Sequence, residues 1–242
     1  MPRLAPVTRA VRPEKVNTAP KLSARAGRVN YRIPEVPFIT FEGIEGCGKS
    51  TQAQRLAERL GSRALLTREP GGTAIGLAVR EVLLDPASRG MAPVTELLLY
   101  FADRAQHMAE VVRPALAKGL VVLCDRHVES SLAYQGYGRR LSLDAIRGLA
   151  ELATGGLRPD AIVLVDVPVA LGLTRARKRG AQDRLEAEVI EFHERVRSGY
   201  DALLAEEPER WLRVDGRGPA DAVFETLWRG LAGRGLVSGE AA

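Results

Sequence analysis

The pattern of hydrophobic and polar positions changes near residue 38. From there on, short apolar runs alternate with longer segments in which apolar residues recur every three or four positions. The short runs predict buried strands at 38–41, 120–124, 161–165 and 211–214. The longer segments predict helices near 49–60, 73–84, 93–117, 142–153, 168–178, 187–205 and 218–232. Strands that alternate with helices indicate an α/β fold, a doubly wound parallel sheet flanked by helices.

The charge of the chain is concentrated before this pattern begins. The 242 residues carry a formal net charge of +5, with a pI near 9.5. Residues 1–37 hold eight Lys or Arg and two Glu, a net charge of +6, so the remaining 205 residues sum to −1. We predict that 1–37 is a basic, disordered N-terminal extension and that 38–242 is one folded domain. Because that domain is nearly neutral, we expect no specific nucleic-acid partner.

Features of export and of membrane insertion are absent from the sequence. No run approaches the roughly 18 apolar residues of a membrane-spanning helix, and 1–37 lacks the apolar core of a secretory signal. The two cysteines, Cys47 and Cys124, have no zinc-binding spacing and would remain thiols in a reducing compartment. We therefore predict a cytoplasmic protein with no membrane partner.

A glycine-rich motif lies between the first predicted strand and the first predicted helix. It reads GIEGCGKS over 43–50 and fits the P-loop pattern G-x-x-x-x-G-K-[ST]. Glycines let backbone N–H groups surround phosphate oxygens, and the following helix directs its positive end toward them. We expect Lys49 to contact the β- and γ-phosphates and the Ser50 hydroxyl to bind Mg²⁺. The predicted ATP-binding residues are Gly43, Ile44, Glu45, Gly46, Cys47, Gly48, Lys49, Ser50 and Thr51.

Two predicted strands end in aspartates, Asp125 and Asp166. Ligands of open α/β sheets bind at the carboxyl ends of the strands, which places both carboxylates near the P-loop. We expect Asp125 to reach the ATP-bound Mg²⁺ through water. Asp166 either does the same or caps a helix.

Further motifs carry a family resemblance. The segments TREPGGT at 67–73, FADRAQH at 101–107, DRH at 125–127 and SSLAYQG at 130–136, together with the P-loop, resemble the bacterial deoxythymidylate kinase family from about 38 to 231. The resemblance implies a P-loop kinase fold with a short mobile lid. It also implies transfer of the γ-phosphoryl group of Mg-ATP to dTMP, and a homodimer.

The predicted binding of the acceptor base rests on one helix and one following segment. Phe101 and Arg104 are three residues apart on a helix and so share a face. By the resemblance, Phe101 stacks on thymine, Arg104 bonds a base carbonyl, and Ser131, Tyr134 and Gln135 contact base or sugar. The alternative is that Phe101 belongs to the core and Arg104 to a surface ion pair.

Two arginines are the candidates for binding the acceptor phosphate. Guanidinium groups bind phosphate through paired hydrogen bonds, and the resemblance assigns this role to Arg68 and Arg126. Glu45 matches a family carboxylate near the acceptor sugar and phosphate. We expect catalysis by alignment and charge neutralisation, with Lys49 and Arg126 in catalytic roles, because a dianionic phosphate oxygen needs no general base.

A basic cluster follows the predicted helix at 168–178. It predicts a lid over about 175–186, although a solvated helix end is the alternative. Gly46 stands where one type within the family carries a P-loop arginine, so the chain resembles the type whose catalytic arginine lies in the lid. Arg177 and Arg179 are the predicted catalytic residues, with Arg179 preferred because Gly180 offers a hinge. Two other functions stay open: a P-loop kinase with a different acceptor, and a nucleic-acid-associated ATPase.

Overall fold

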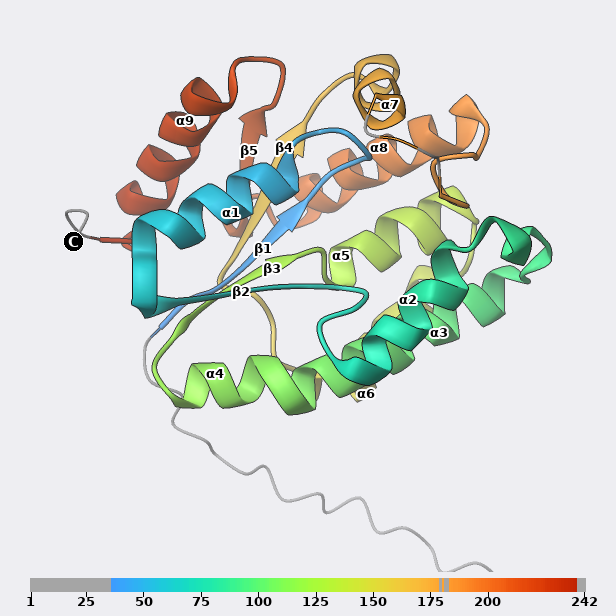
Figure 1. Cartoon of the computed structure of the whole chain (residues 1–242), viewed down its shortest axis with the longest axis horizontal. Helices are drawn as coiled ribbons and strands as arrows, with labels where there is room; N and C mark the ends of the chain where they lie inside the picture. Colours follow the sequence, from blue (N-terminus) through green and yellow to red (C-terminus); the bar gives the residue numbers. More distant parts are fainter. Residues whose placement is uncertain (1–35, 179, 181–182, 239–242) are drawn as a thin grey trace, which may run out of the picture. The chain divides into compact units, whose positions relative to one another are not determined.

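The computed structural model describes residues 36–178, 180 and 183–238. Its centre is one five-stranded parallel sheet in the order β2-β3-β1-β4-β5 (Figure 1). The predicted all-parallel α/β architecture is therefore confirmed. The strands are β1 (Phe38–Glu42), β2 (Ala64–Arg68), β3 (Val121–Asp125), β4 (Ala161–Asp166) and β5 (Trp211–Asp215).

Helices flank the sheet, with α1 and α9 packed against one another and α3 packed against α2 and α6 (Figure 1). Within the described ranges, no helix combines the length and the apolar character needed to cross a membrane. The α-helices are α1 (Lys49–Leu60), α2 (Ala74–Leu84), α3 (Pro93–His107), α4 (Arg113–Ala117), α5 (Val128–Ser131), α6 (Leu143–Thr154), α7 (Val169–Arg177), α8 (Ile190–Glu206) and α9 (Ala220–Gly233). Two π-helical segments, η3 (Met108–Val112) and η4 (Leu132–Gly138), and three short 3₁₀ turns, η1 (Gly61–Arg63), η2 (Pro86–Gly90) and η5 (Pro208–Arg210), complete the described part of the chain.

The central strand β1 shows why these elements pack as they do. All five of its residues are buried, as expected for a strand covered on both faces. Ile39 and Phe41 belong to the larger apolar cluster, which includes Leu56 of α1 and Leu227 of α9. Phe38 belongs to a second cluster with residues of η3 and α4. Alternation along the strand therefore places helices on both faces of the sheet.

The carboxyl ends of the strands gather charged side chains at one edge of the sheet. Asp125 ends β3 and is in register with Phe41 of β1 and Arg68 of β2, while Asp166 of β4 is paired with Asp215 of β5. The P-loop leaves β1 at this same edge. The fold thus collects the P-loop and these charged strand ends where ligands of open α/β sheets bind.

One strand of the sheet was not predicted from the sequence. The strand β2 is only partly buried and ends in the polar residues Thr67 and Arg68, so its apolar run is shorter than those of the other strands. The helix predicted over 93–117 is three consecutive segments, because the π-helical η3 separates α3 from α4. The extension predicted at 1–37 lies, apart from its last two residues, outside the described residues and stays a prediction.

Candidate active site

The P-loop connects β1 to the first residue of α1. Gly43, Gly46 and Gly48 have φ values of 137°, 68° and 101°, a region that favours glycine. Lys49 begins α1 and its Nζ lies 3.5 Å from the backbone oxygen of Ile44, so the side chain folds back over the loop. The glycine-rich loop therefore leads directly into the N-terminus of the 12-residue helix α1. Backbone N–H groups of such a loop and helix N-terminus are the groups that bind phosphate.

Gly46 is fixed by a close approach of two backbones. A Cβ at Gly46 would lie 2.0 Å from the Gly172 oxygen in α7, and a Cβ at Gly172 would lie 2.5 Å from the Glu45 oxygen. Any larger residue at either position would push α7 away from the loop. The geometry thus explains why position 46 carries no arginine.

Ser50 and Asp125 bring two oxygen ligands together beside the P-loop. The Ser50 hydroxyl donates a hydrogen bond to Asp125 Oδ2, joining α1 to the end of β3. Asp125 Oδ1 is buried and has no hydrogen-bond partner among the described residues. Hydroxyl and carboxylate oxygens are the ligands that Mg²⁺ prefers. The chemistry of the pair therefore fits a divalent cation of this kind.

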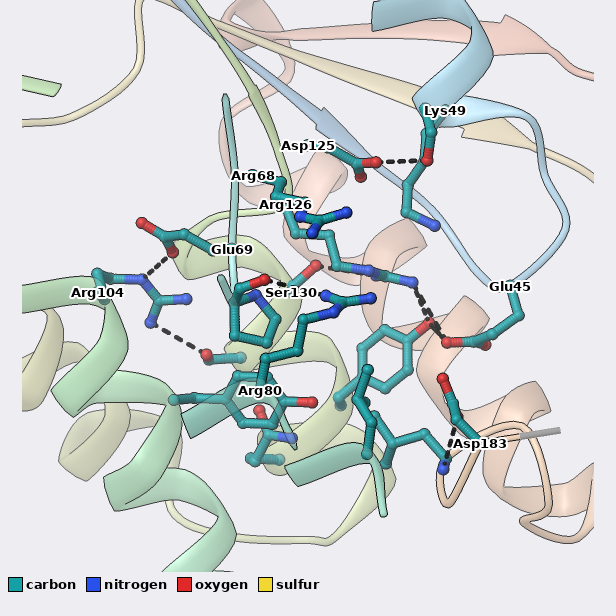
Figure 2. Close-up of a pocket in the computed structure, with 18 of the residues that line it drawn as sticks. Glu45, Lys49, Arg68, Glu69, Arg80, Arg104, Asp125, Arg126, Ser130 and Asp183 are labelled. Carbon is teal, nitrogen blue, oxygen red and sulfur yellow. Dashed lines mark hydrogen bonds and ion pairs between the residues drawn. The ribbon is translucent and has the colours of Figure 1, made fainter. Parts of the chain in front are cut away.

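A cavity of about 190 Å³ opens next to the P-loop. Glu45, Lys49 and Ser50 form one side of it. The ends of β2 and β3, the helices α2, α3 and α5, the π-helical η4, and Asp183, Leu185 and Glu186 form the rest. Five cationic side chains line it, Lys49, Arg68, Arg80, Arg104 and Arg126 (Figure 2), together with five carboxylates. The guanidinium groups of this lining suit an anionic ligand held against the P-loop.

Arg126 lies between the P-loop and η4. Its Nη2 donates to Glu45 Oε1 at 3.2 Å and to the Tyr134 hydroxyl at 3.0 Å, while its Nη1 donates to Ser130 Oγ at 3.0 Å. The backbone of Arg126 has a φ of 74°, unusual for a residue with a side chain. Such strain is typical of functional sites, where surrounding contacts hold one geometry.

Glu45 is ionised in this environment. Burial alone would raise its pKa, but His193, Arg126 and Lys49 outweigh that effect and lower the pKa to about 2. A carboxylate that keeps its charge can hold the Arg126 guanidinium in place at any physiological pH.

Arg104 is almost fully buried, at 1% exposure, yet it lines the cavity. Its Nε donates to Glu69 Oε2 at 2.7 Å, its Nη1 to Ser131 Oγ at 3.1 Å and its Nη2 to the His127 oxygen at 2.9 Å. Glu69 also receives His107 at 2.9 Å. Three of the five guanidinium N–H groups are therefore committed, and two remain to donate.

The remaining predicted residues fall into three groups. Arg68 and Gln135 line the cavity, as do Ser131 and Tyr134. Thr51 lines a second cavity of about 370 Å³, together with Gly46, Cys47 and Gly48. Ile44 is 3% exposed and belongs to the core.

Comparison with known proteins decides the family. The family model "Thymidylate kinase" matches residues 41–227. The chain belongs to the thymidylate kinase family. It is 52% identical over 194 residues to a thymidylate kinase of Geobacter sulfurreducens, covering 76% of this chain and 91% of the relative. It is 51% identical over 201 residues to one of Deinococcus radiodurans, covering 82% and 97%.

A solved structure supports the same assignment. The crystal structure of thymidylate kinase from Ehrlichia chaffeensis aligns with a TM-score of 0.69 at 31% identity, over 82% of this chain and all of that one. The architecture of this thymidylate kinase family member thus matches that of a family member solved by crystallography.

The structure places Phe101 differently from the sequence expectation. Phe101 is 5% exposed and packs in the core cluster. The Arg104 guanidinium lies 4.6 Å from the centre of its ring. Phe101 is not among the residues that line the cavity. Tyr100 lines the cavity instead. Tyr100 precedes Arg104 by four residues, and residues four apart lie on the same face of a helix, as residues three apart do. The spacing of Tyr100 and Arg104 was therefore visible in the sequence. Because Phe101 also has a suitable spacing, the sequence did not show which of the two rings faces the cavity.

Arg80 of α2 is a second residue that sequence reasoning missed. It lines the cavity with Arg68 and donates to the Pro70 oxygen at 3.0 Å. Partial burial and then the charge of Arg68 lower the pKa of Arg80, a sign that two cations share this space. No motif at position 80 signals this, because only folding brings α2 beside the end of β2.

The lid segment is described in part. Arg175 donates to the backbone oxygens of Gly216 at 2.8 Å and Arg217 at 3.1 Å and lines the second cavity. Arg177 ends α7 and is exposed. Arg179 lies outside the described residues.

Asp166 takes neither of the roles considered from the sequence. Its carboxylate accepts hydrogen bonds from Arg197 at 2.9 and 3.1 Å and from Arg213. Burial would raise the pKa of Asp166, but these two arginines lower it. Asp166 therefore ties α8 to β5.

Proposed function

We propose that this protein phosphorylates dTMP to dTDP, with Mg-ATP as the phosphoryl donor. The observation that carries the proposal is the cavity that joins the P-loop lysine, Lys49, to the buried base-edge residues Arg104 and Gln135 in a thymidylate kinase family member. One end of this cavity suits a phosphate and the other a pyrimidine.

The acceptor is held by residues of the cavity. Arg68, Arg80 and Arg126 bind its phosphate, and Glu45 fixes Arg126. The base stacks on Tyr100 and meets Arg104 and Gln135 at its edge, while Ser131 and Tyr134 complete the pocket. In this assignment the stacking role moves from Phe101 to Tyr100.

The donor is held on the other side of the loop. Residues 43–51 bind the phosphates of ATP, and the second cavity, closed by Arg175 and Gly216, takes the remainder of the nucleotide. Ser50 and Asp125 hold Mg²⁺, which neutralises phosphate charge when it is bound. Lys49 and a lid arginine, Arg177 or Arg179, stabilise the charge on the transferring group.

The transfer needs alignment rather than proton abstraction. The second pKa of a phosphate monoester is near 6, so an oxygen of the acceptor is already an anionic nucleophile at neutral pH. The obstacle is the repulsion between two anionic substrates, which the cavity's cations reduce. Lid closure would exclude water as a competing acceptor.

Three further assignments belong to this proposal. We place the enzyme in the cytoplasm, with 38–242 as the kinase domain and 1–37 as an extension dispensable for activity. We expect a homodimer, because large apolar side chains are exposed on α2 and α3: Ile75, Leu77, Val82, Val94 and Leu98.

The test is transfer of label from [γ-³²P]ATP. Label in dTDP that depends on added dTMP supports the proposal, and Lys49→Ala should abolish it. Release of inorganic phosphate at the same rate with and without dTMP would contradict it and favour an ATPase.

A further inference from the structure

The orientation of the Gln135 amide is fixed by a buried carboxylate. Gln135 Nε2 donates to Glu96 Oε1 at 2.9 Å, and both residues are at most 1% exposed. An ionised carboxylate only accepts hydrogen bonds, so the amide nitrogen must face Glu96. The amide oxygen then points away from Glu96, and no residue in the described part of the chain donates to it.

Glu96 is held as an acceptor by two arginines. Arg139 donates to it through Nε at 3.2 Å and Nη2 at 3.1 Å, and Arg184 Nη1 lies 2.6 Å from Oε2. Burial would raise the pKa of Glu96, but the hydrogen bonds from Arg139 and Gln135 lower it. The carboxylate therefore stays ionised at neutral pH.

The cavity lining thus includes one donor and one acceptor for a base edge, Arg104 and Gln135 Oε1. Arg104 keeps two free N–H groups, and Ser131, which receives Arg104, precedes Gln135 by four residues. Thymine and uracil carry a carbonyl acceptor at position 4 beside an N3–H donor, whereas cytosine carries an amino donor at position 4 beside an N3 acceptor. With Arg104 opposite position 4 and Gln135 Oε1 opposite N3, thymine and uracil pair at both positions, whereas cytosine sets donor against donor and acceptor against acceptor.

We propose that Glu96 is a positioning residue for base selection, which acts by holding the Gln135 amide so that its oxygen faces the base. Glu96 touches no substrate itself. The inference rests on the proposed function, since it requires a pyrimidine in this cavity, and it adds the prediction that a cytosine nucleotide is rejected.

The test replaces Glu96 by its amide. In Glu96→Gln, the amide oxygen replaces Oε2, which accepts from Arg184, and the NH₂ group replaces Oε1 and faces Gln135. To accept from this NH₂ group, Gln135 must rotate its amide so that its oxygen faces position 96 and its nitrogen faces the base. The ratio of kcat/KM for dTMP to that for dCMP should fall at least about tenfold, mainly through a higher KM for dTMP. The control Glu188→Gln removes another carboxylate from Arg139, 2.7 Å away, and should leave the ratio unchanged.

A double substitution separates positioning from general damage. Gln135→Leu should lower the same ratio, and adding Glu96→Gln should lower it no further, because Glu96 acts only through Gln135. A ratio does not depend on the fraction of folded enzyme, so loss of stability cannot imitate the effect. An unchanged ratio in Glu96→Gln, or effects that multiply in the double variant, would overturn the inference. A parent enzyme that does not phosphorylate dTMP would overturn the proposed function instead.

Discussion

The Tyr134 hydroxyl donates a hydrogen bond to Glu45 Oε1 at 2.6 Å, and this contact ties η4 to the P-loop. The same oxygen receives Arg126, so one carboxylate connects the loop that binds the donor to the arginine assigned to the acceptor. In the function proposed above, one side chain therefore connects the donor site to the acceptor site.

We predict that Glu45→Gln lowers kcat/KM for dTMP roughly 10- to 100-fold, because a hydrogen bond to a charged group contributes about 1.5–3 kcal/mol. Steady-state kinetics would measure the effect, with the exposed Glu58→Gln on α1 as control. An effect below about twofold would show that Arg126 keeps its position without Glu45.

We predict opposite outcomes at two adjacent aromatics. Tyr100→Ala should raise KM for dTMP about tenfold or more while the protein stays folded, because base stacking contributes about 1–3 kcal/mol. Phe101→Ala should instead lower the free energy of unfolding by about 3–5 kcal/mol, since it leaves a cavity in the core. Urea unfolding and kinetics on both variants decide the point, and the reverse pattern would restore Phe101 as the stacking residue.

The sequence predicted the parallel sheet, α1 to the residue and most of the residues around the cavity, because strand, P-loop and helix follow local periodicity and spacing. It could not predict Arg80 or the pairing of Glu96 with Gln135. These contacts join residues 10 positions apart (Arg80 and Pro70) and 39 positions apart (Glu96 and Gln135), and nothing local in either segment reveals the partner. Phe101 and Tyr100 show an intermediate case, in which the helix was predicted but its rotation about its axis was not.

We predict that one lid arginine stabilises the transferring phosphoryl group. Arg179→Ala or Arg177→Ala should lower kcat by roughly 10³- to 10⁵-fold with little change in KM for dTMP. Arg175→Ala is the comparison, because Arg175 is bound to the 216–217 backbone and should mainly raise KM for ATP. If both Arg177→Ala and Arg179→Ala keep kcat within about tenfold of the parent, neither residue has this role.

We predict a pH-dependent stability centred on Glu42. Burial, and then the charge of Glu129, raise the pKa of Glu42 to about 7, against 4.5 as the reference value, despite donation from Ser130, Tyr200 and the His127 N–H. Between these pH values the folded state binds one more proton than the unfolded state, so stability falls as pH rises, by at most ~1.4 kcal/mol per pH unit. The contribution of Glu42 to the free energy of unfolding is fully present below pH 4.5 and is lost as the pH rises through 7.

Urea unfolding of the parent and of Glu42→Gln at pH 5, 6, 7 and 8 tests this directly. The difference between the two proteins cancels the titration of other groups, and it should shift in favour of Glu42→Gln as pH rises. A difference that stays constant across this range would mean that Glu42 is already ionised at pH 5.

One competition experiment decides which nucleoside monophosphate this enzyme phosphorylates in preference to the others. Equal concentrations of dTMP, dUMP, dCMP, dGMP and AMP are offered together with limiting Mg-ATP, and the diphosphate products are separated and quantified. We predict dTDP as the main product and dUDP as a minor one, because the methyl group that dUMP lacks contributes only about 1–3 kcal/mol to discrimination. A purine diphosphate formed as fast as dTDP would contradict the claim.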